Sequence, residues 1–129
     1  TPEKQTVLVV DDEPVLRNSA CRLVRSLGME AIAAGDGLEA IQEFKRRPGQ
    51  IDIVLLDLTM PGMNGVDCFH QLRALAPELP ILLTSGFSKV GSPEALLELP
   101  HVGFLPKPYE RQDLARAIEE TLADVGRAE

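Results

Sequence analysis

Hydrophobic residues along this chain gather in short, unbroken runs that are separated by segments with helical spacing. Three strong apolar runs cover residues 6–10, 51–56 and 80–84, and shorter ones cover 30–34 and 102–105. Runs without polar alternation are typical of strands that are covered on both faces of a sheet. The pattern therefore predicts five buried strands.

The segments between these runs carry apolar residues at helical spacing. In the first segment, Pro14 suits an opening helical turn and Gly28 is a typical stop signal. Asp36 is placed to cap the second helix. We expect five helices, over residues 14–27, 38–47, 66–75, 92–98 and 110–125.

Strand and helix alternate strictly along the chain, and this order predicts the fold class. Buried strands in such an order indicate an α/β fold in which helices cover both faces of a parallel sheet. We expect a five-stranded, doubly wound parallel sheet. Connections are short and no linker or repeat is visible, so we expect one domain over residues 1–129. In such folds the functional crevice lies at the carboxyl ends of the strands.

Composition and charge narrow the classes of function. A length of 129 residues, with 44% apolar and 26% charged residues, suits one globular domain. The formal net charge of −7 argues against a surface that grips nucleic-acid phosphates. We therefore expect no direct nucleic acid binding.

The sequence shows no signal for membrane insertion or secretion. No apolar run approaches the ~20 residues of a membrane helix, and no basic segment followed by an apolar one opens the chain. The first residue is not Met, so the start of the chain decides nothing about an upstream signal or domain. Cys21 and Cys68 form neither a disulfide framework nor a paired metal motif. We expect reduced thiols in a cytoplasmic protein.

Polar residues stand where the predicted strands end. The ends of the first, third, fourth and fifth strands carry, in that order, Asp11 with Asp12, Asp57, Ser85 and Lys107. Because the carboxyl ends of parallel strands share one edge of a sheet, this edge should gather three carboxylates, a hydroxyl and an ammonium. Clustered hard oxygen ligands suit Mg²⁺, which takes one or two carboxylates together with waters and phosphate oxygens.

Each of these residues also has a plainer interpretation. A single acid at a strand end is usually solvated or caps the next helix, and Asp12 or Glu13 could cap the helix that begins at Pro14. His70 and His101 lie outside the acidic edge, and we expect both at the surface. The combination of residue types at one edge, in this order, favours a functional site over chance.

Four short motifs mark the same positions: VDDE after the first strand, LLDLTMPGMNG around Asp57, TSG after the fourth strand and KP after the fifth. Together they resemble the receiver domain of two-component response regulators, over nearly the whole chain. The resemblance implies a flavodoxin-like sheet with the strand order 2-1-3-4-5. The resemblance implies a switch that accepts a phosphoryl group in a Mg²⁺-dependent reaction and then changes its partner-binding face. The donor would be a phosphohistidine on a sensor histidine kinase or a histidine phosphotransfer domain.

The resemblance also implies a role for each residue at this edge. Asp57 would be the phosphoacceptor and a metal ligand. Asp12 would bind Mg²⁺ directly and Asp11 mainly through water, and the backbone carbonyl of Thr59 would be a further ligand. Lys107 would pair with a phosphoryl oxygen.

Ser85 and Phe104 resemble the switch residues of the family. Ser85 would hydrogen-bond a phosphoryl oxygen. We prefer it to Thr84, since strand side chains alternate and the family has a small residue, here Gly86, after this hydroxyl. Phe104 would swing inward on activation, and an ordinary core phenylalanine is the alternative. Phe87 would cover the path of water toward the phosphoryl group.

Three rival functions fit the fold class. A dehalogenase-type phosphatase with an aspartate nucleophile would need a second acid two residues after Asp57, where Thr59 stands. A flavin-binding module would need hydroxyls and amides in its first loop, where the segment DDEP would repel a phosphate. A receiver-like interaction module that is never phosphorylated is the third, although the three acids, Ser85 and Lys107 argue against it.

Only the resemblance indicates which class of protein this domain comes from. We expect a single receiver domain with no output domain in this chain, and no turnover beyond its own phosphorylation and dephosphorylation. The segments LLTSGFS and FLPKPY resemble receivers attached to hybrid sensor histidine kinases. That favours a hybrid kinase as the parent over a stand-alone regulator.

Overall fold

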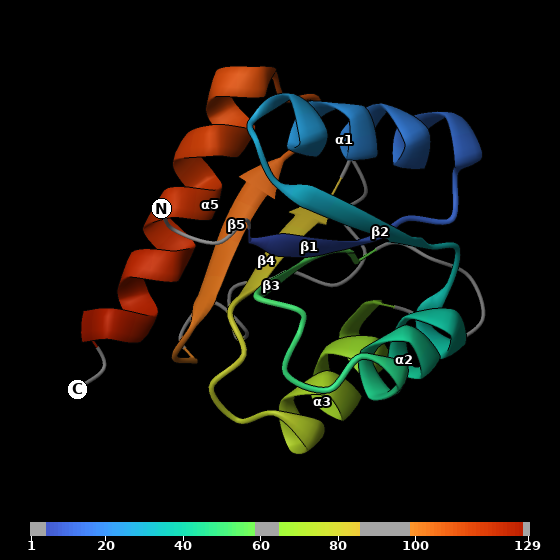
Figure 1. The fold of residues 1–129 in the computed structure, drawn as a ribbon, viewed down its shortest axis with the longest axis vertical. Helices are drawn as coiled ribbons and strands as arrows, with labels where there is room; N and C mark the ends of the chain where they lie inside the picture. Colours follow the sequence, from blue (N-terminus) through green and yellow to red (C-terminus); the bar gives the residue numbers. More distant parts are fainter. Residues whose placement is uncertain (1–4, 59–64, 86–98, 128–129) are drawn as a thin grey trace.

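The computed structural model describes residues 5–58, 65–85 and 99–127 of the chain. Up to residue 85, and again from residue 102, strands and helices alternate as the hydrophobic pattern predicts (Figure 1). The strands are β1 (Thr6–Val10), β2 (Glu30–Ala34), β3 (Ile53–Asp57), β4 (Ile81–Ser85) and β5 (Val102–Pro106). The helices are α1 (Pro14–Ser26), α2 (Gly37–Arg46), α3 (Gly65–Leu75) and α5 (Arg111–Arg127).

All neighbouring strands are parallel, and the order across the sheet is β2-β1-β3-β4-β5. This confirms the predicted doubly wound α/β fold and its strand order. The helix predicted at 92–98 lies outside the described residues, as do Thr59, Gly86 and Phe87.

The predicted ends of three strands were wrong by one or two residues, and β5 ends at Pro106 rather than at Leu105. β3 begins at Ile53 and includes Asp57, because Asp57 pairs in register with Thr84 of β4. β4 likewise extends to Ser85, which pairs with Pro106 of β5. The strands therefore carry their polar end residues inside the sheet rather than in the loops that follow.

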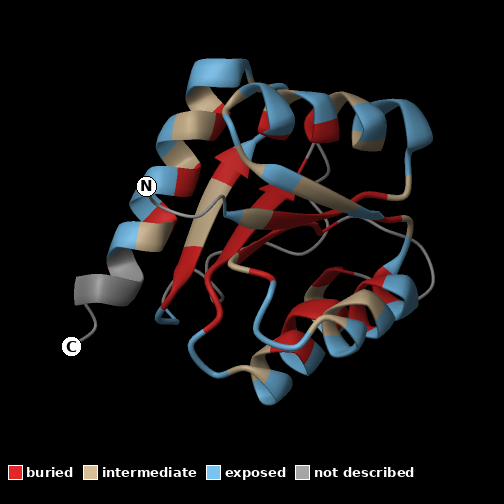
Figure 2. Ribbon diagram, in the orientation of Figure 1, coloured by how far each residue is buried: buried red, intermediate tan, exposed pale blue. Residues whose placement is uncertain are grey.

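Helices cover both faces of the sheet, and each face has its own hydrophobic core. α2 and α3 pack on one face, over a cluster that includes Leu8 and Leu56. α1 and α5 pack on the other, over a cluster that includes Val7 and Leu55 (Figure 1). Consecutive strand residues thus alternate between the two cores, as strand geometry requires. Figure 2 shows β3 and β4 buried between helices whose outer sides are exposed, whereas β2 and β5, at the edges of the sheet, are only partly buried.

The ends of the first two helices follow from local sequence. Asp36 Oδ1 accepts a hydrogen bond of 2.7 Å from the backbone N–H of Glu39, which confirms the predicted cap of α2. Gly28 follows α1 with φ of 90°, a conformation that suits glycine after a helix. Glu13, at the start of α1, makes no side-chain capping bond, so the capping alternative fails for that acid.

One expectation about polar residues was wrong. His70 is exposed, as expected, but His101 is only 7% exposed and adopts a positive φ of 65°. The backbone explains this, because Ile81 N–H donates to the His101 carbonyl at 2.9 Å and fixes the residue against the start of β4. Cys21 and Cys68 are both buried and form no disulfide with each other, and their redox state stays a prediction. In the described segments, no helix has the length and apolarity that crossing a membrane requires.

Candidate functional site

The parallel register brings four strand ends to one edge of the sheet. Asp11 follows β1 directly, and Asp57 and Ser85 are the last residues of β3 and β4. Lys107 follows β5, and its backbone N–H donates to the Ser85 carbonyl at 3.0 Å. The sheet topology therefore brings together the residues that were predicted at this edge.

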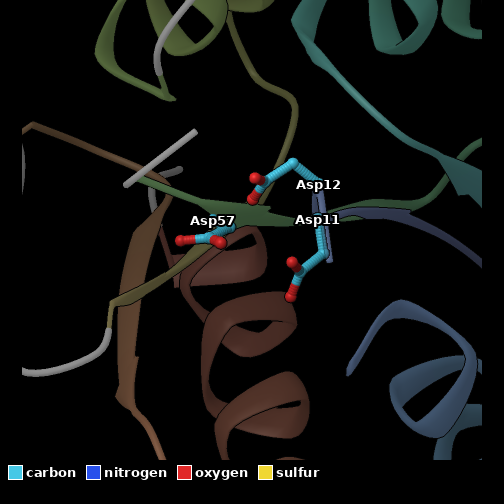
Figure 3. Close-up of side chains that lie close together, drawn as sticks. All are labelled: Asp11, Asp12 and Asp57. Atoms are coloured by element: carbon cyan, nitrogen blue, oxygen red, sulfur yellow. The ribbon is translucent and has the colours of Figure 1, made fainter. Parts of the chain in front are cut away.

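Three carboxylates converge at this edge. One oxygen atom from each of Asp11, Asp12 and Asp57 lies within 4.8 Å of the others. Asp11 is 5% exposed and Asp57 2% exposed, while Asp12 is intermediate. Figure 3 shows Asp11 and Asp12 projecting from the end of β1, beside Asp57 from the end of β3. Charges so close and so poorly hydrated need a cation to balance their repulsion.

Lys107 supplies one such cation from the end of β5. Its Nζ donates to Asp11 Oδ2 at 3.0 Å and to Asp57 Oδ2 at 3.2 Å. Burial alone would lower the pKa of Lys107, but the hydrogen bonds to Asp11 and Asp57 and the charges of both acids outweigh it, so the pKa is raised. The ammonium therefore stays charged, and three carboxylates against one ammonium leave an excess of two negative charges.

The turn after β1 holds the first two acids. Asp11 N–H donates to the Ala34 carbonyl at 3.1 Å, which ties the turn to the end of β2. Asp11 Oδ1 accepts from Glu13 N–H at 3.0 Å, and Arg17 Nη1 donates to the Asp11 carbonyl at 2.9 Å. The role of Arg17 was not predicted, although a cation in the first turn of the helix after the acids is a visible signal in the sequence.

A glycine at the start of α3 allows that helix to approach the end of β3. A Cβ at Gly65 would overlap Leu58 Cα and the Asp57 carbonyl, which are backbone atoms that cannot move aside cheaply. Only a residue without a side chain fits here. The close packing of α3 therefore fixes the backbone of Asp57, which carries the carboxylate.

Ser85 and Thr84 occupy opposite faces at the end of β4. Thr84 follows Leu82 in the alternation and faces α1 and α5, and its hydroxyl has no hydrogen-bond partner among the described residues. Ser85 follows Leu83 in the alternation and is 8% exposed. The alternation that favoured Ser85 over Thr84 is thus present, and its contact with a phosphoryl group stays a prediction.

Phe104 lies on the same face of the sheet as Ser85. It pairs in register with Leu83 and packs, partly buried, against the core beneath α2 and α3. Leu83 stands two residues before Ser85, so Phe104 is a diagonal neighbour of the serine. The predicted movement of the ring stays a prediction.

Tyr109 is a second residue near the acids that was not predicted from the sequence. It follows the cis peptide between Lys107 and Pro108 and packs against the core beneath α1 and α5. Burial, and then the charges of Asp11 and Asp57, raise the pKa of its phenol to about 12. The acid cluster is therefore close enough to act on this side chain.

The donor set fits Mg²⁺. Carboxylate oxygens are hard ligands, and Mg²⁺ is usually held by one or two of them together with waters. Asp12 is open to solvent, and Asp11 and Asp57 are buried beside it, so the cluster has both an entrance and a fixed base. The predicted fourth ligand, the Thr59 carbonyl, lies outside the described residues.

Comparison with known proteins agrees with this geometry. The family model described as "Response regulator receiver domain" matches residues 7–119. The chain is 39% identical to the sensory transduction protein RegX3 of Mycolicibacterium smegmatis and 33% identical to the sensor kinase CckA of Brucella abortus, over 91% of its length in each case. It spans 50% of RegX3 and 12% of CckA.

Solved structures share the arrangement. The chemotaxis protein CheY4 of Vibrio cholerae is similar with a TM-score of 0.80 and 26% identity. The similarity covers 92% of this chain and 99% of that one. The acid cluster thus lies in a fold that other receivers share almost from end to end.

Proposed function

The chain belongs to the response regulator receiver family, and from this premise we propose that it is a phosphorylatable signalling switch whose phosphoacceptor is Asp57. Receiver domains act in two-component signalling, bind Mg²⁺ at an acidic site and interact with histidine kinases and phosphotransfer proteins. The observation that carries the proposal is the bridge from Lys107 Nζ to Asp57 at 3.2 Å and to Asp11 at 3.0 Å.

Asp57 would act as a carboxylate nucleophile. One of its oxygens bonds to the phosphorus of a phosphohistidine while the P–N bond breaks. The bonding electron pair stays on the imidazole nitrogen, and the ring leaves neutral when its other nitrogen carries a proton. Such a transfer depends on in-line positioning and charge neutralisation, which a fixed, buried carboxylate beside an ammonium supports.

Lys107 and Ser85 would hold the transferred group. The ammonium already lies between Asp11 and Asp57, so it can follow the negative charge onto a phosphoryl oxygen. The Ser85 hydroxyl would donate to a second oxygen from the end of the neighbouring strand. Asp11, Asp12 and Asp57 would hold Mg²⁺ with the Thr59 carbonyl, and the bound ion would neutralise the phosphoryl oxygens.

The output would be a change in the face around β5. When Ser85 turns toward the phosphoryl group, it vacates space on the face where its diagonal neighbour Phe104 packs. An inward movement of Phe104 would then alter the surface along β5, on the face of the sheet that α2 and α3 cover. A side chain with two discrete positions is the bistable element that such a switch needs.

We also propose the wider setting of this domain. Residues 1–129 form a single receiver domain, it works in the cytoplasm, and its donor is a sensor histidine kinase or a histidine phosphotransfer domain. A hybrid kinase as the parent is supported by the similarity to the receiver domain of the hybrid histidine kinase CckA, and a separate sensory transduction protein by the similarity to RegX3. The phosphatase alternative lacks support, since position 59 carries Thr where that chemistry needs an acid.

Phosphorylation can be tested by intact mass after incubation with acetyl phosphate and Mg²⁺. We expect one added phosphoryl group that hydroxylamine removes, because an acyl phosphate is labile to this nucleophile. Asp57→Asn should gain none, while the control Asp67→Asn, which removes an exposed carboxylate from α3, should behave as the parent. A hydroxylamine-labile phosphate on Asp57→Asn would refute the assignment.

A further inference from the structure

The turn that carries Asp11 and Asp12 brings the carboxylates of two consecutive residues together. Side chains of consecutive residues in a strand point to opposite faces of the sheet. The carboxylates of Asp11 and Asp12 nevertheless reach within 4.8 Å of one another and of Asp57. Residues 11–13 belong to neither β1 nor α1, so no regular ladder of hydrogen bonds fixes their shape. Other contacts must hold the turn.

Arg17 makes a charged contact from α1 to the backbone of this turn. Its Nη1 donates to the Asp11 carbonyl at 2.9 Å from the first turns of α1. Two further bonds act on Asp11, from its own N–H to the Ala34 carbonyl and from Glu13 N–H to its Oδ1. Together they hold the peptide groups on both sides of Asp11, and Arg17 fixes the one that leads into Asp12.

The next turn along the sheet edge leaves room for the guanidinium. A Cβ at Gly35 would lie 3.0 Å from Arg17 Nη1 and 3.4 Å from Glu39 Oε1. Gly35 N–H donates to Glu39 Oε1 at 2.7 Å, so this glycine is held in place from α2. The guanidinium therefore lies between the turn after β1 and the turn after β2, in a space that the missing side chain leaves open.

We propose that Arg17 is a positioning residue for the metal site, which holds the Asp11 carbonyl and thereby keeps the carboxylates of Asp11 and Asp12 converged. This inference rests on the proposed Mg²⁺-dependent function and assigns a further residue to it. It also predicts whether the loss of Arg17 weakens or strengthens Mg²⁺ binding. A cation near the site should by charge alone weaken Mg²⁺ binding, whereas a positioning residue should strengthen it.

The positioning effect of Arg17 on Mg²⁺ binding should outweigh the effect of its charge. Arg17 is only partly buried, so water screens its charge, while a loosened turn would act directly on the ligands. Loss of groups that orient metal ligands typically weakens metal binding by about 10–100-fold. We expect Arg17→Met to weaken Mg²⁺ binding about tenfold, at the low end of that range, because two other bonds still hold Asp11.

The test is titration calorimetry of Mg²⁺ on the full 129-residue chain. The matched control is Arg22→Met, which removes the same charge from an exposed position on the same helix and should bind as the parent does. Arg17→Lys keeps a cationic donor and should recover most of the affinity. A purely electrostatic role would instead make Arg17→Met bind more tightly.

Gly35→Ala is a second, independent probe. Its methyl group would push against the guanidinium, and the far end of a flexible side chain can move aside, so the fold should survive. We expect weaker Mg²⁺ binding when Arg17 is present and no further loss in Arg17→Met. This variant keeps the inference falsifiable if Arg17→Met does not fold.

The outcomes separate the two proposals. If the parent chain does not bind Mg²⁺, the proposed function fails and this inference fails with it. If the parent binds but Arg17→Met and Gly35→Ala bind as tightly as Arg22→Met, the inference alone is refuted. Weaker binding in both variants, with recovery in Arg17→Lys, supports it.

Discussion

Lys107 Nζ lies 3.0 Å from Asp11 Oδ2, although 96 positions separate the two residues in the chain. The same nitrogen lies 3.2 Å from Asp57 Oδ2, so one ammonium links the ends of β1, β3 and β5. The lysine side chain is 16% exposed, and the two carboxylate side chains are 7% and 3% exposed. An ion pair this well shielded should act measurably on the stability of the fold.

Replacement of Lys107 by Met should destabilise the metal-free protein. Removal of one partner leaves the buried charges of Asp11 and Asp57 uncompensated, at a cost of about 2 kcal/mol, less than for a fully buried pair because the edge is partly wet. For a chain of 129 residues this lowers the melting midpoint by about 7 °C. Thermal unfolding in EDTA measures it, with Lys45→Met, an exposed lysine on α2, as the control.

Asp57→Asn should shift the same midpoint in the opposite direction. It removes one of three crowded negative charges while Lys107 still pairs with Asp11. Saturating Mg²⁺ should stabilise the parent more than this variant, since the variant has lost a ligand. Equal midpoints for the parent, Lys107→Met and Asp57→Asn in EDTA would show that charge repulsion does not limit stability here.

Gly103→Ala tests the packing of α5 on the sheet. A Cβ at Gly103 would overlap the Thr121 hydroxyl and lie 3.2 Å from Leu82 Cδ1. We expect a loss of about 1–3 kcal/mol in the free energy of unfolding, measured with urea. Thr121→Ala removes the obstructing hydroxyl, so the double variant should be more stable than Gly103→Ala alone. Simple additivity of the two changes would contradict this contact.

The fold and the acid cluster could be predicted because few alternatives exist. Continuous apolar strands that alternate with helices leave a parallel sheet as the main solution, and parallel strands bring Asp11, Asp57 and Lys107 to one edge whatever their side chains do. The ends of the strands were harder to predict. Asp57 continues β3 because its backbone pairs with Thr84, and a hydrophobicity pattern carries no information on backbone pairing.

Residues that act through the backbone escaped prediction. Arg17 reaches a carbonyl across a turn, and any long polar side chain could be imagined to do so. His101 is buried because its main chain is fixed beside β4, a position that its polar side chain does not suggest. The influence of the acids on Tyr109 depends on how the chain bends after Lys107, which no periodic pattern encodes.

The two thiols should be unreactive in the native protein. Cys68 is fully buried, and burial followed by the charge of Asp36 raises the pKa of its thiol to about 12. Burial also raises the pKa of Cys21, which is 3% exposed. Because the thiolate is the reactive form, a thiol reagent at neutral pH should react only as fast as the protein opens. Denaturant should release both thiols, and prompt reaction of the native protein would contradict their burial.

Tyr109 offers a direct optical test of the field at the site, because it is the only tyrosine in the chain and there is no tryptophan. Its pKa is raised from 10.0 to about 12, first by burial and then by the charges of Asp11 and Asp57. A raised phenol pKa means that folding favours the neutral form. The stability from this group is therefore complete below pH 10 and is lost as the pH rises from 10 toward 12.

Absorbance of the tyrosinate form, followed against pH, measures this shift in the native chain and in the urea-unfolded chain. The native midpoint should lie well above the unfolded one. Asp57→Asn should lower it only in part, since burial is the larger cause and Asp11 still carries its charge, whereas the exposed control Asp67→Asn should leave it unchanged. A native midpoint that equals the unfolded one would place Tyr109 in water, away from the acids. If Asp57→Asn leaves the native midpoint unchanged, the charge of Asp57 does not contribute to the raised pKa of Tyr109.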